Sequence, residues 1–143
     1  MRLGLKARHW PGRLAVGAYI LNSGLTKRTA DDETAKYLHQ GASTAYPMMK
    51  RLDPRTFTRL LSWGEITVGT ALLLPVVPTV AAGAGLTAFS AGLVGLYLRT
   101  PGMRREKSLR PSEQGIALAK DFWMLGMGLG FLVDELTSER PRR

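Results

Sequence analysis

ITVGTALLLPVVPTVAAGAGLTAFSAGLVGLYL, at residues 66–98, decides the fold: it is a run of 33 residues without a charge between Glu65 and Arg99. A helix needs roughly 20 mostly apolar residues to cross the hydrocarbon core of a bilayer. Soluble helices instead keep one polar face toward water. The run therefore predicts an integral membrane protein. The alternative is a soluble protein with one fully buried helical hairpin.

Two prolines, Pro75 and Pro78, divide this run. A continuous helix through both would lose backbone hydrogen bonds. We therefore expect a tight turn here, between one span at about 57–77 and another at about 79–98. At 1.5 Å per residue, the second of these is roughly 30 Å long, which is enough to cross the bilayer.

Two further apolar segments flank this hairpin, at about 13–27 and 115–133. The first is short, and we expect Arg13 and Lys27 to lengthen it by snorkelling to the interface. Polar loops at 28–56 and 99–114 connect the spans. In the first loop, the acidic cluster at 31–33 and the pair Asp53-Pro54 indicate helix starts. The predicted fold is all-α: one domain over residues 1–143, forming a polytopic four-helix transmembrane bundle.

The net charge of +9 fits this topology. Lys and Arg gather in cytoplasmic loops of membrane proteins, and here they favour, weakly, a cytoplasmic location of the two long loops. No aromatic residues alternate with them as a nucleic-acid stacking surface requires, so we expect a lipid bilayer and no nucleic acid as partner. The chain has no cysteine, which excludes disulfides and thiol chemistry. His9 and His39 are too few for a metal cage.

Ionisable residues inside the predicted spans are the candidate functional residues, because charge within a membrane is costly and usually serves a purpose. If the four spans alternate in direction, these residues fall in the same half of the bilayer and could form one polar cluster. The structural alternative is an ion pair that fixes the register of two helices. The candidate cluster consists of Asn22, Lys27, Glu65, Lys120 and Asp121.

Small residues four positions apart recur in the third and fourth segments. Such pairs let helix backbones approach closely in a membrane. We expect them to pack within the bundle rather than to form a dimer face. The pairs are Ala81 with Gly85, Ala88 with Gly92, and Gly126 with Gly130.

Short motifs follow one another along most of residues 13–133: RLAVG at 13–17, SGLTK at 23–27, Gly64-Glu65 ahead of Gly69, LLL at 72–74, a glycine-rich third segment and Lys120-Asp121. In this order and spacing the chain resembles the DoxX-like family of small four-helix integral membrane proteins. The resemblance implies a multi-pass protein of the bacterial inner membrane. Some members of that family are associated with quinone-linked oxidation of sulfur compounds or with redox-stress complexes, often beside a partner subunit.

Two functions follow as hypotheses. The first is an accessory or scaffold subunit that docks a partner protein in a membrane complex. The alternative is a quinone-interacting subunit of a membrane oxidoreductase, which uses the intramembrane Glu, Asp and Lys residues and needs a quinone but no covalently bound cofactor. The intramembrane charges would also suit a transporter of small solutes or lipids. Because no complete catalytic constellation is present, the sequence favours the accessory subunit and leaves open whether the chain is an enzyme.

Overall fold

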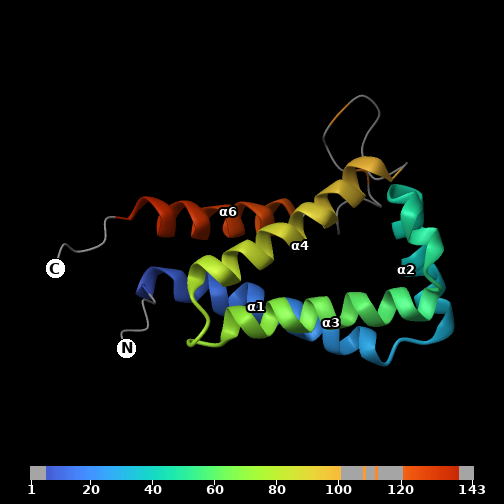
Figure 1. The fold of residues 1–143 in the computed structure, drawn as a ribbon, viewed down its shortest axis with the longest axis horizontal. Helices are drawn as coiled ribbons and strands as arrows, with labels where there is room; N and C mark the ends of the chain where they lie inside the picture. The colour runs from blue at the N-terminus through green and yellow to red at the C-terminus, as the bar shows by residue number, and fades with distance from the viewer. Residues whose placement is uncertain (1–5, 101–107, 109–111, 113–120, 139–143) are drawn as a thin grey trace.

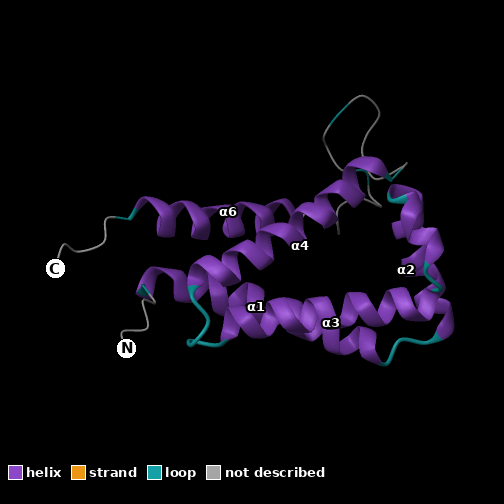
Figure 2. Cartoon of the chain, in the orientation of Figure 1, coloured by secondary structure: helices purple, strands orange, loops and turns teal. Residues whose placement is uncertain are grey.

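The structure is a computed structural model that describes residues 6–100, 108, 112 and 121–138, and the chain is helical throughout its regular elements in that part. The predicted all-α class is confirmed (Figure 2). The elements are η1 (Ala7–His9), α1 (Trp10–Arg28), α2 (Asp32–Ala45), η2 (Pro47–Arg51), α3 (Pro54–Leu73), α4 (Thr79–Arg99) and α6 (Asp121–Thr137).

The long helices form two antiparallel pairs, α1 with α3 and α4 with α6 (Figure 1). α4 also contacts α3, so that the two pairs lie against each other. The shorter helix α2 crosses one end of the assembly and touches both α3 and α4. α2 therefore holds the two pairs at a fixed separation at that end.

Local signals set most of the helix boundaries. Asp31 caps α2 by accepting a hydrogen bond from the amide of Thr34 at 2.8 Å, and Asp53 caps α3 by accepting one from the amide of Thr56 at 3.1 Å. The hydroxyl and the amide of Thr56 both donate hydrogen bonds to Asp53. They hold the pKa of Asp53 below its ordinary value, since they favour the ionised carboxylate. Both predicted helix starts are confirmed.

The predicted turn between the second and third spans is also confirmed, but the predicted end of the second span at residue 77 is wrong. α3 ends at Leu73, because a proline two residues later cannot continue the helical hydrogen bonding. The amide of Val77 instead donates to the carbonyl of Leu74 at 3.2 Å. The predicted third span matches α4, and α1 begins three residues before the predicted first span. The predicted start of the fourth span lies outside the described residues.

α1 and α3 pack closely because glycines line their contact. A Cβ added to Gly69 would lie 2.6 Å from the backbone nitrogen of Leu21 and 2.9 Å from the carbonyl oxygen of Gly17. A Cβ at Gly24 would lie 2.9 Å from the carbonyl oxygen of Ser62. These three neighbouring atoms belong to backbone, so any side chain at Gly69 or Gly24 would force the helices apart.

The small-residue pairs expected inside the bundle do not all lie there: Gly126 and Gly130 are exposed on α6, and that prediction is wrong for them. In the described part of the chain, a Cβ at either glycine would meet nothing within 4 Å, whereas one at Gly85 would lie 3.8 Å from Val68 Cγ2. The contact between α4 and α6 uses Gly128 instead, where a Cβ would lie 2.9 Å from the amide nitrogen of Thr87. Spacing by four marks a stripe on a helix, but the neighbouring helices decide which stripe faces inward.

Arg13 is fully buried, and the prediction that it snorkels to the interface is wrong. The open C-terminal end of α3 and the following turn present carbonyl groups that lack helical partners, and the guanidinium has five N–H donors in a planar fork. Its Nε donates to Leu72 O at 2.8 Å, its Nη1 to Thr79 Oγ1 at 3.0 Å, and its Nη2 to the carbonyl oxygens of Ala71, Leu74 and Val77 at 2.8, 3.0 and 3.1 Å.

On the long helices, three charged side chains are buried and many large apolar side chains are exposed. Arg13, Glu65 and Asp121 are at most 5% exposed. In contrast, large apolar side chains cover the outer faces of the four long helices, with no exposed charge between them along each helix. We call this surface the apolar belt; it consists of Leu14, Tyr19, Leu25, Leu60, Trp63, Leu74, Val80, Leu98, Phe122, Trp123, Leu129 and Val133.

One helix among the described residues, α4, is long and apolar enough by composition to cross a membrane. α1 and α3 are of similar length but include charged residues. In both helices the charges nearest the middle, Arg13 and Glu65, point into the protein.

Candidate functional site

A buried ion pair joins α1 to α3. The Nζ atom of Lys27 lies 3.0 Å from each carboxylate oxygen of Glu65 and donates a further bond of 2.6 Å to Ser23 Oγ. Glu65 is 5% exposed, and the Lys27 side chain is 19% exposed. The two carboxylate oxygens and the Ser23 hydroxyl thus lie around the ammonium, which offsets the cost of taking both charges out of water.

The close approach of α1 and α3 positions this pair. Ser62 Oγ donates to the carbonyl oxygen of Gly24 at 2.7 Å, one turn along each helix from the ion pair. Ser62, Glu65 and Gly69 share one face of α3, as expected from their spacing. Since that face lies against α1, Glu65 meets the lysine at the C-terminal end of α1.

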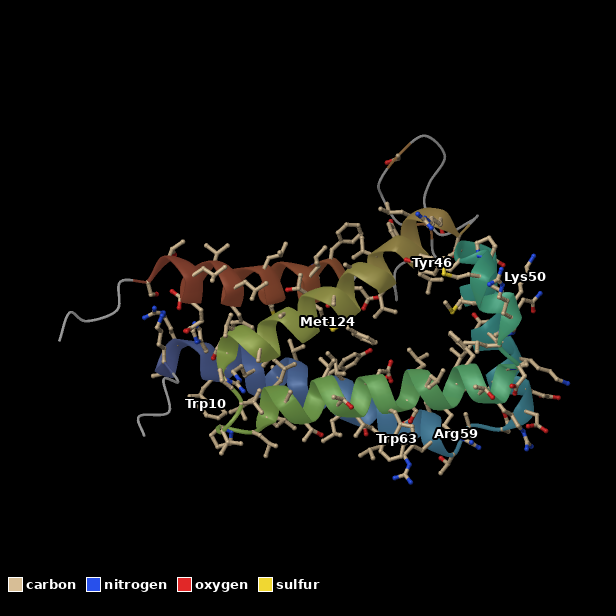
Figure 3. All side chains as sticks on the ribbon, viewed as in Figure 1. Trp10, Tyr46, Lys50, Arg59, Trp63 and Met124 are labelled. Atoms are coloured by element: carbon tan, nitrogen blue, oxygen red, sulfur yellow. The ribbon has the colours of Figure 1, made fainter. Side chains whose placement is uncertain are left out.

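The ion pair lies at the wall of a largely apolar cavity of about 460 Å³ between α1, α2, α3, α4 and α6. This volume is in the range of cavities that bind small organic molecules. Figure 3 labels Tyr46, at the end near α2, and Met124, a residue of α6. The apolar lining of the cavity includes Tyr19, Ile20, Phe57, Leu61, Phe89, Leu93, Leu96 and Met124. The polar lining of the cavity includes Ser23, Lys27, Tyr46, Glu65 and Asp121.

The structure brings three of the five predicted site residues to this cavity: Lys27, Glu65 and Asp121. Asp121 is 1% exposed at the first described residue of α6. Lys120 lies outside the described residues. Asn22 is exposed and does not line the cavity. At 3.6 residues per turn, Asn22 is rotated by roughly 140° from Lys27, so that both cannot face α3.

Tyr46 is a cavity residue that sequence reasoning missed. Its hydroxyl donates to the carbonyl oxygen of Gly92 at 2.7 Å, and the guanidinium carbon of Arg99 lies 5.2 Å from its ring centre. A Cβ at Gly95 would lie 2.0 Å from the hydroxyl oxygen, so the glycine makes room for the tyrosine. The tyrosine closes the cavity where α2 contacts α4. Nothing local in the sequence indicates this contact, because it joins segments 46 residues apart.

A second polar cluster joins the beginning and the end of the described chain. His9 Nε2 lies 2.6 Å from Asp134 Oδ2, and His9 Nδ1 lies 3.6 Å from Glu135 Oε1. One ligand atom of each of these residues lies within 4.8 Å of the others, a spacing suited to a metal ion. However, Lys6 and Arg8 already form ion pairs with these carboxylates. We therefore interpret the cluster as an ion-pair clasp between η1 and α6.

The cavity offers polar groups that can recognise a ligand. Its described lining contains no cysteine or histidine, and the hydroxyl groups of Ser23 and Tyr46 are already hydrogen-bonded. Lys27 presents a hydrogen-bond donor and Glu65 an acceptor at the edge of an apolar space. This arrangement suits a ligand with an apolar body and a polar, oxygen-bearing end.

Comparisons with protein families, with curated proteins and with solved structures each found no match to this chain.

Proposed function

We propose that this protein is a multi-pass helical membrane protein that binds a small amphiphile of the quinone type in the cavity beside Lys27 and Glu65. The observation that carries the proposal is a buried ion pair at the wall of an apolar cavity of about 460 Å³. The resemblance noted in the sequence agrees with it, and implies a bacterial inner membrane as the location.

The apolar belt supports the membrane part of the proposal. Soluble proteins seldom expose contiguous large apolar surface while burying arginine, glutamate and aspartate inside. In a bilayer the same distribution is favourable, since lipid covers the apolar side chains and the protein interior pairs the charges. We propose that α1, α3, α4 and α6 all cross the membrane. Inside the protein, Arg13 is bonded to carbonyl groups and Glu65 is paired with Lys27, which lets α1 and α3 cross despite these charges.

Membrane insertion predicts a position-dependent effect of arginine. Leu129 is 46% exposed on α6, and Gln40 is exposed on α2, away from the apolar belt. An arginine in the middle of a transmembrane helix costs about 2.5 to 3.5 kcal/mol, whereas one on a watery surface costs little. We expect Leu129→Arg, but not Gln40→Arg, to lower the protein recovered in membranes after an alkaline carbonate wash. Recovery of the wild-type protein in the soluble fraction would contradict insertion.

The ion pair gives the polar contacts that a quinone needs. A quinone carbonyl accepts a hydrogen bond from the Lys27 ammonium, and a quinol hydroxyl donates one to the Glu65 carboxylate. The aromatic and aliphatic side chains of α3 and α4 then surround the ring. If the protein takes part in oxidation, it does so without thiols of its own, because the chain has no cysteine.

Removing the ion pair is expected to empty the cavity. Hydrogen bonds to charged groups contribute about 1.5 to 3 kcal/mol, so Lys27→Met should lower bound quinone at least about tenfold, and Glu65→Gln similarly. The matched control is Glu33→Gln, which removes an exposed carboxylate of α2. The measurement is quinone extracted per chain after purification from native membranes in mild detergent. We expect close to one in the wild type and in the control.

The second candidate function, an accessory subunit of a membrane complex, is favoured by an outward pair of small residues. Gly126 and Gly130 on α6 are exposed and leave backbone open to a neighbouring helix. The same purification separates the two functions. Absence of quinone from the wild type and from every variant would contradict the quinone proposal. A second protein present in equal amount, and lost on Gly130→Leu, would support the accessory role.

A further inference from the structure

A second, polar hollow opens where the end of α1, the start of α2 and the first half of α3 meet. It has a volume of about 660 Å³ and is separate from the apolar cavity, although Lys27 borders both. Four basic residues line it. The lining consists of Lys27, Arg28, Ala30, Asp31, Asp32, Ala35, Arg55, Thr58, Arg59, Ser62 and Trp63; we call it the basic groove.

Two of the four basic residues are already paired. Lys27 binds Glu65, and Arg55 Nε lies 2.6 Å from Asp32 Oδ1. The hydrogen bond from Arg55 lowers the pKa of Asp32, so this pair stays ionised at neutral pH. The other acidic residue, Asp31, caps α2 through the amide of Thr34. Both carboxylates of the groove are therefore engaged.

The remaining cations, Arg28 and Arg59, form no ion pair with a carboxylate in the described part of the chain. Both are exposed. Their guanidinium groups bring two positive charges and a set of planar donors to one groove. Such donors match the oxygen atoms of a phosphate, which arginine binds through paired hydrogen bonds. The groove is thus suited to a phosphate-bearing anion.

Trp63 connects the groove to the apolar belt. It is 52% exposed, and the guanidinium carbon of Arg28 lies 5.3 Å from its ring centre. Arg59 and Trp63 are one turn apart on α3 and lie on the same side of it in Figure 3. Tryptophan is enriched where membrane meets water. From this point toward the C-terminal end of α3 the exposed side chains carry no charge.

We propose that the basic groove binds the phosphate of an anionic membrane lipid, with Arg28 and Arg59 as phosphate ligands and Trp63 against the upper acyl chains. A soluble phosphate ester offers the same anionic group. The groove favours the lipid because its cations border the apolar belt. The phosphate of one lipid molecule contacts the cations while its acyl chains contact the belt. The inference rests on the membrane location proposed above.

The test compares lipids that share acyl chains and differ in headgroup. The purified protein in neutral detergent is titrated with dioctanoyl phosphatidylglycerol, dioctanoyl phosphatidylcholine or glycerol phosphate, and bound lipid is counted by native mass spectrometry. We expect at least tenfold tighter binding of phosphatidylglycerol than of phosphatidylcholine. The double variant Arg28→Gln/Arg59→Gln should bind phosphatidylglycerol about 30-fold more weakly, with phosphatidylcholine unchanged.

The matched control is Lys50→Gln/Arg51→Gln, which removes the same charge from exposed residues outside the groove. We expect it to bind like the wild type. An equal loss in the control, or none in the Arg28/Arg59 variant, overturns the site. Displacement of phosphatidylglycerol by equimolar glycerol phosphate overturns the lipid as ligand.

Arg28→Lys and Arg59→Lys are conservative variants that keep the charge but lose the planar fork, so that a loss of binding is not due to misfolding. Each should bind phosphatidylglycerol more weakly than the wild type and more tightly than the double glutamine variant. Wild-type affinity in both would contradict the arginines as paired phosphate ligands. Failure of the carbonate assay would contradict the proposed membrane location. A membrane-bound protein without headgroup preference would contradict this inference alone.

Discussion

Gly69→Ala is expected to lower the free energy of unfolding by about 2 kcal/mol or more, since overpacking a close contact costs about 1 to 3 kcal/mol. The new Cβ would lie 2.6 Å from the amide nitrogen of Leu21 and 2.9 Å from Gly17 O. Neither atom belongs to a side chain that could rotate away. α1 and α3 must therefore separate, and the ion pair between Lys27 and Glu65 lengthens with them.

The matched control is Gly64→Ala on the same helix, where a Cβ would meet no described residue within 4 Å. Alanine there removes the conformational cost of glycine in a helix and should stabilise the protein by up to about 1 kcal/mol. Thermal unfolding in mild detergent, followed by tryptophan fluorescence, measures both changes. Equal midpoints for the two variants would show that α1 and α3 do not approach as closely as described.

Arg13→Met is expected to have a still larger effect, about 4 kcal/mol, because it leaves buried carbonyl groups at the end of α3 and in the following turn without their donor. The methionine fills similar volume and removes the charge. For a chain of this length we expect the midpoint of thermal unfolding to fall by about 12 °C. Arg13→Lys should lose less, since an ammonium has three donors where the guanidinium uses five hydrogen bonds.

Arg51→Met provides the comparison for Arg13. Arg51 is exposed at the end of η2, and its replacement should change the free energy of unfolding by less than about 0.5 kcal/mol. If Arg13→Met unfolded within 2 °C of Arg51→Met, water or other donors would have to satisfy the carbonyl groups. The guanidinium would then not hold the end of α3.

The sequence by itself determined the helices and many of their ends. The run at 66–98 predicted two helices, and Pro75 and Pro78 predicted the break between them, because proline lacks the amide hydrogen that a helix needs. Asp31 and Asp53 predicted the starts of α2 and α3, since a capping carboxylate binds amides only two or three residues away. All of these features depend on neighbours in the chain.

Only the tertiary structure decided which faces of the helices meet. The buried face of α1 carries Arg13, Gly17 and Gly24 at helical spacing, so the sequence contained a signal that Arg13 turns inward with the glycines. The acceptors that make this burial favourable lie 58 to 66 residues away. No local pattern specifies them, because they become neighbours only when α1 packs against α3.

The same distinction explains the candidate site. Glu65 was identified from its place inside an apolar helix, where a carboxylate needs a partner. That its partner is Lys27, that Asn22 points away, and that Tyr46 closes the cavity follow from helix rotation and from the crossing of α2. Sequence spacing fixes which residues share a face; the direction of that face is set by the packing of several helices at once.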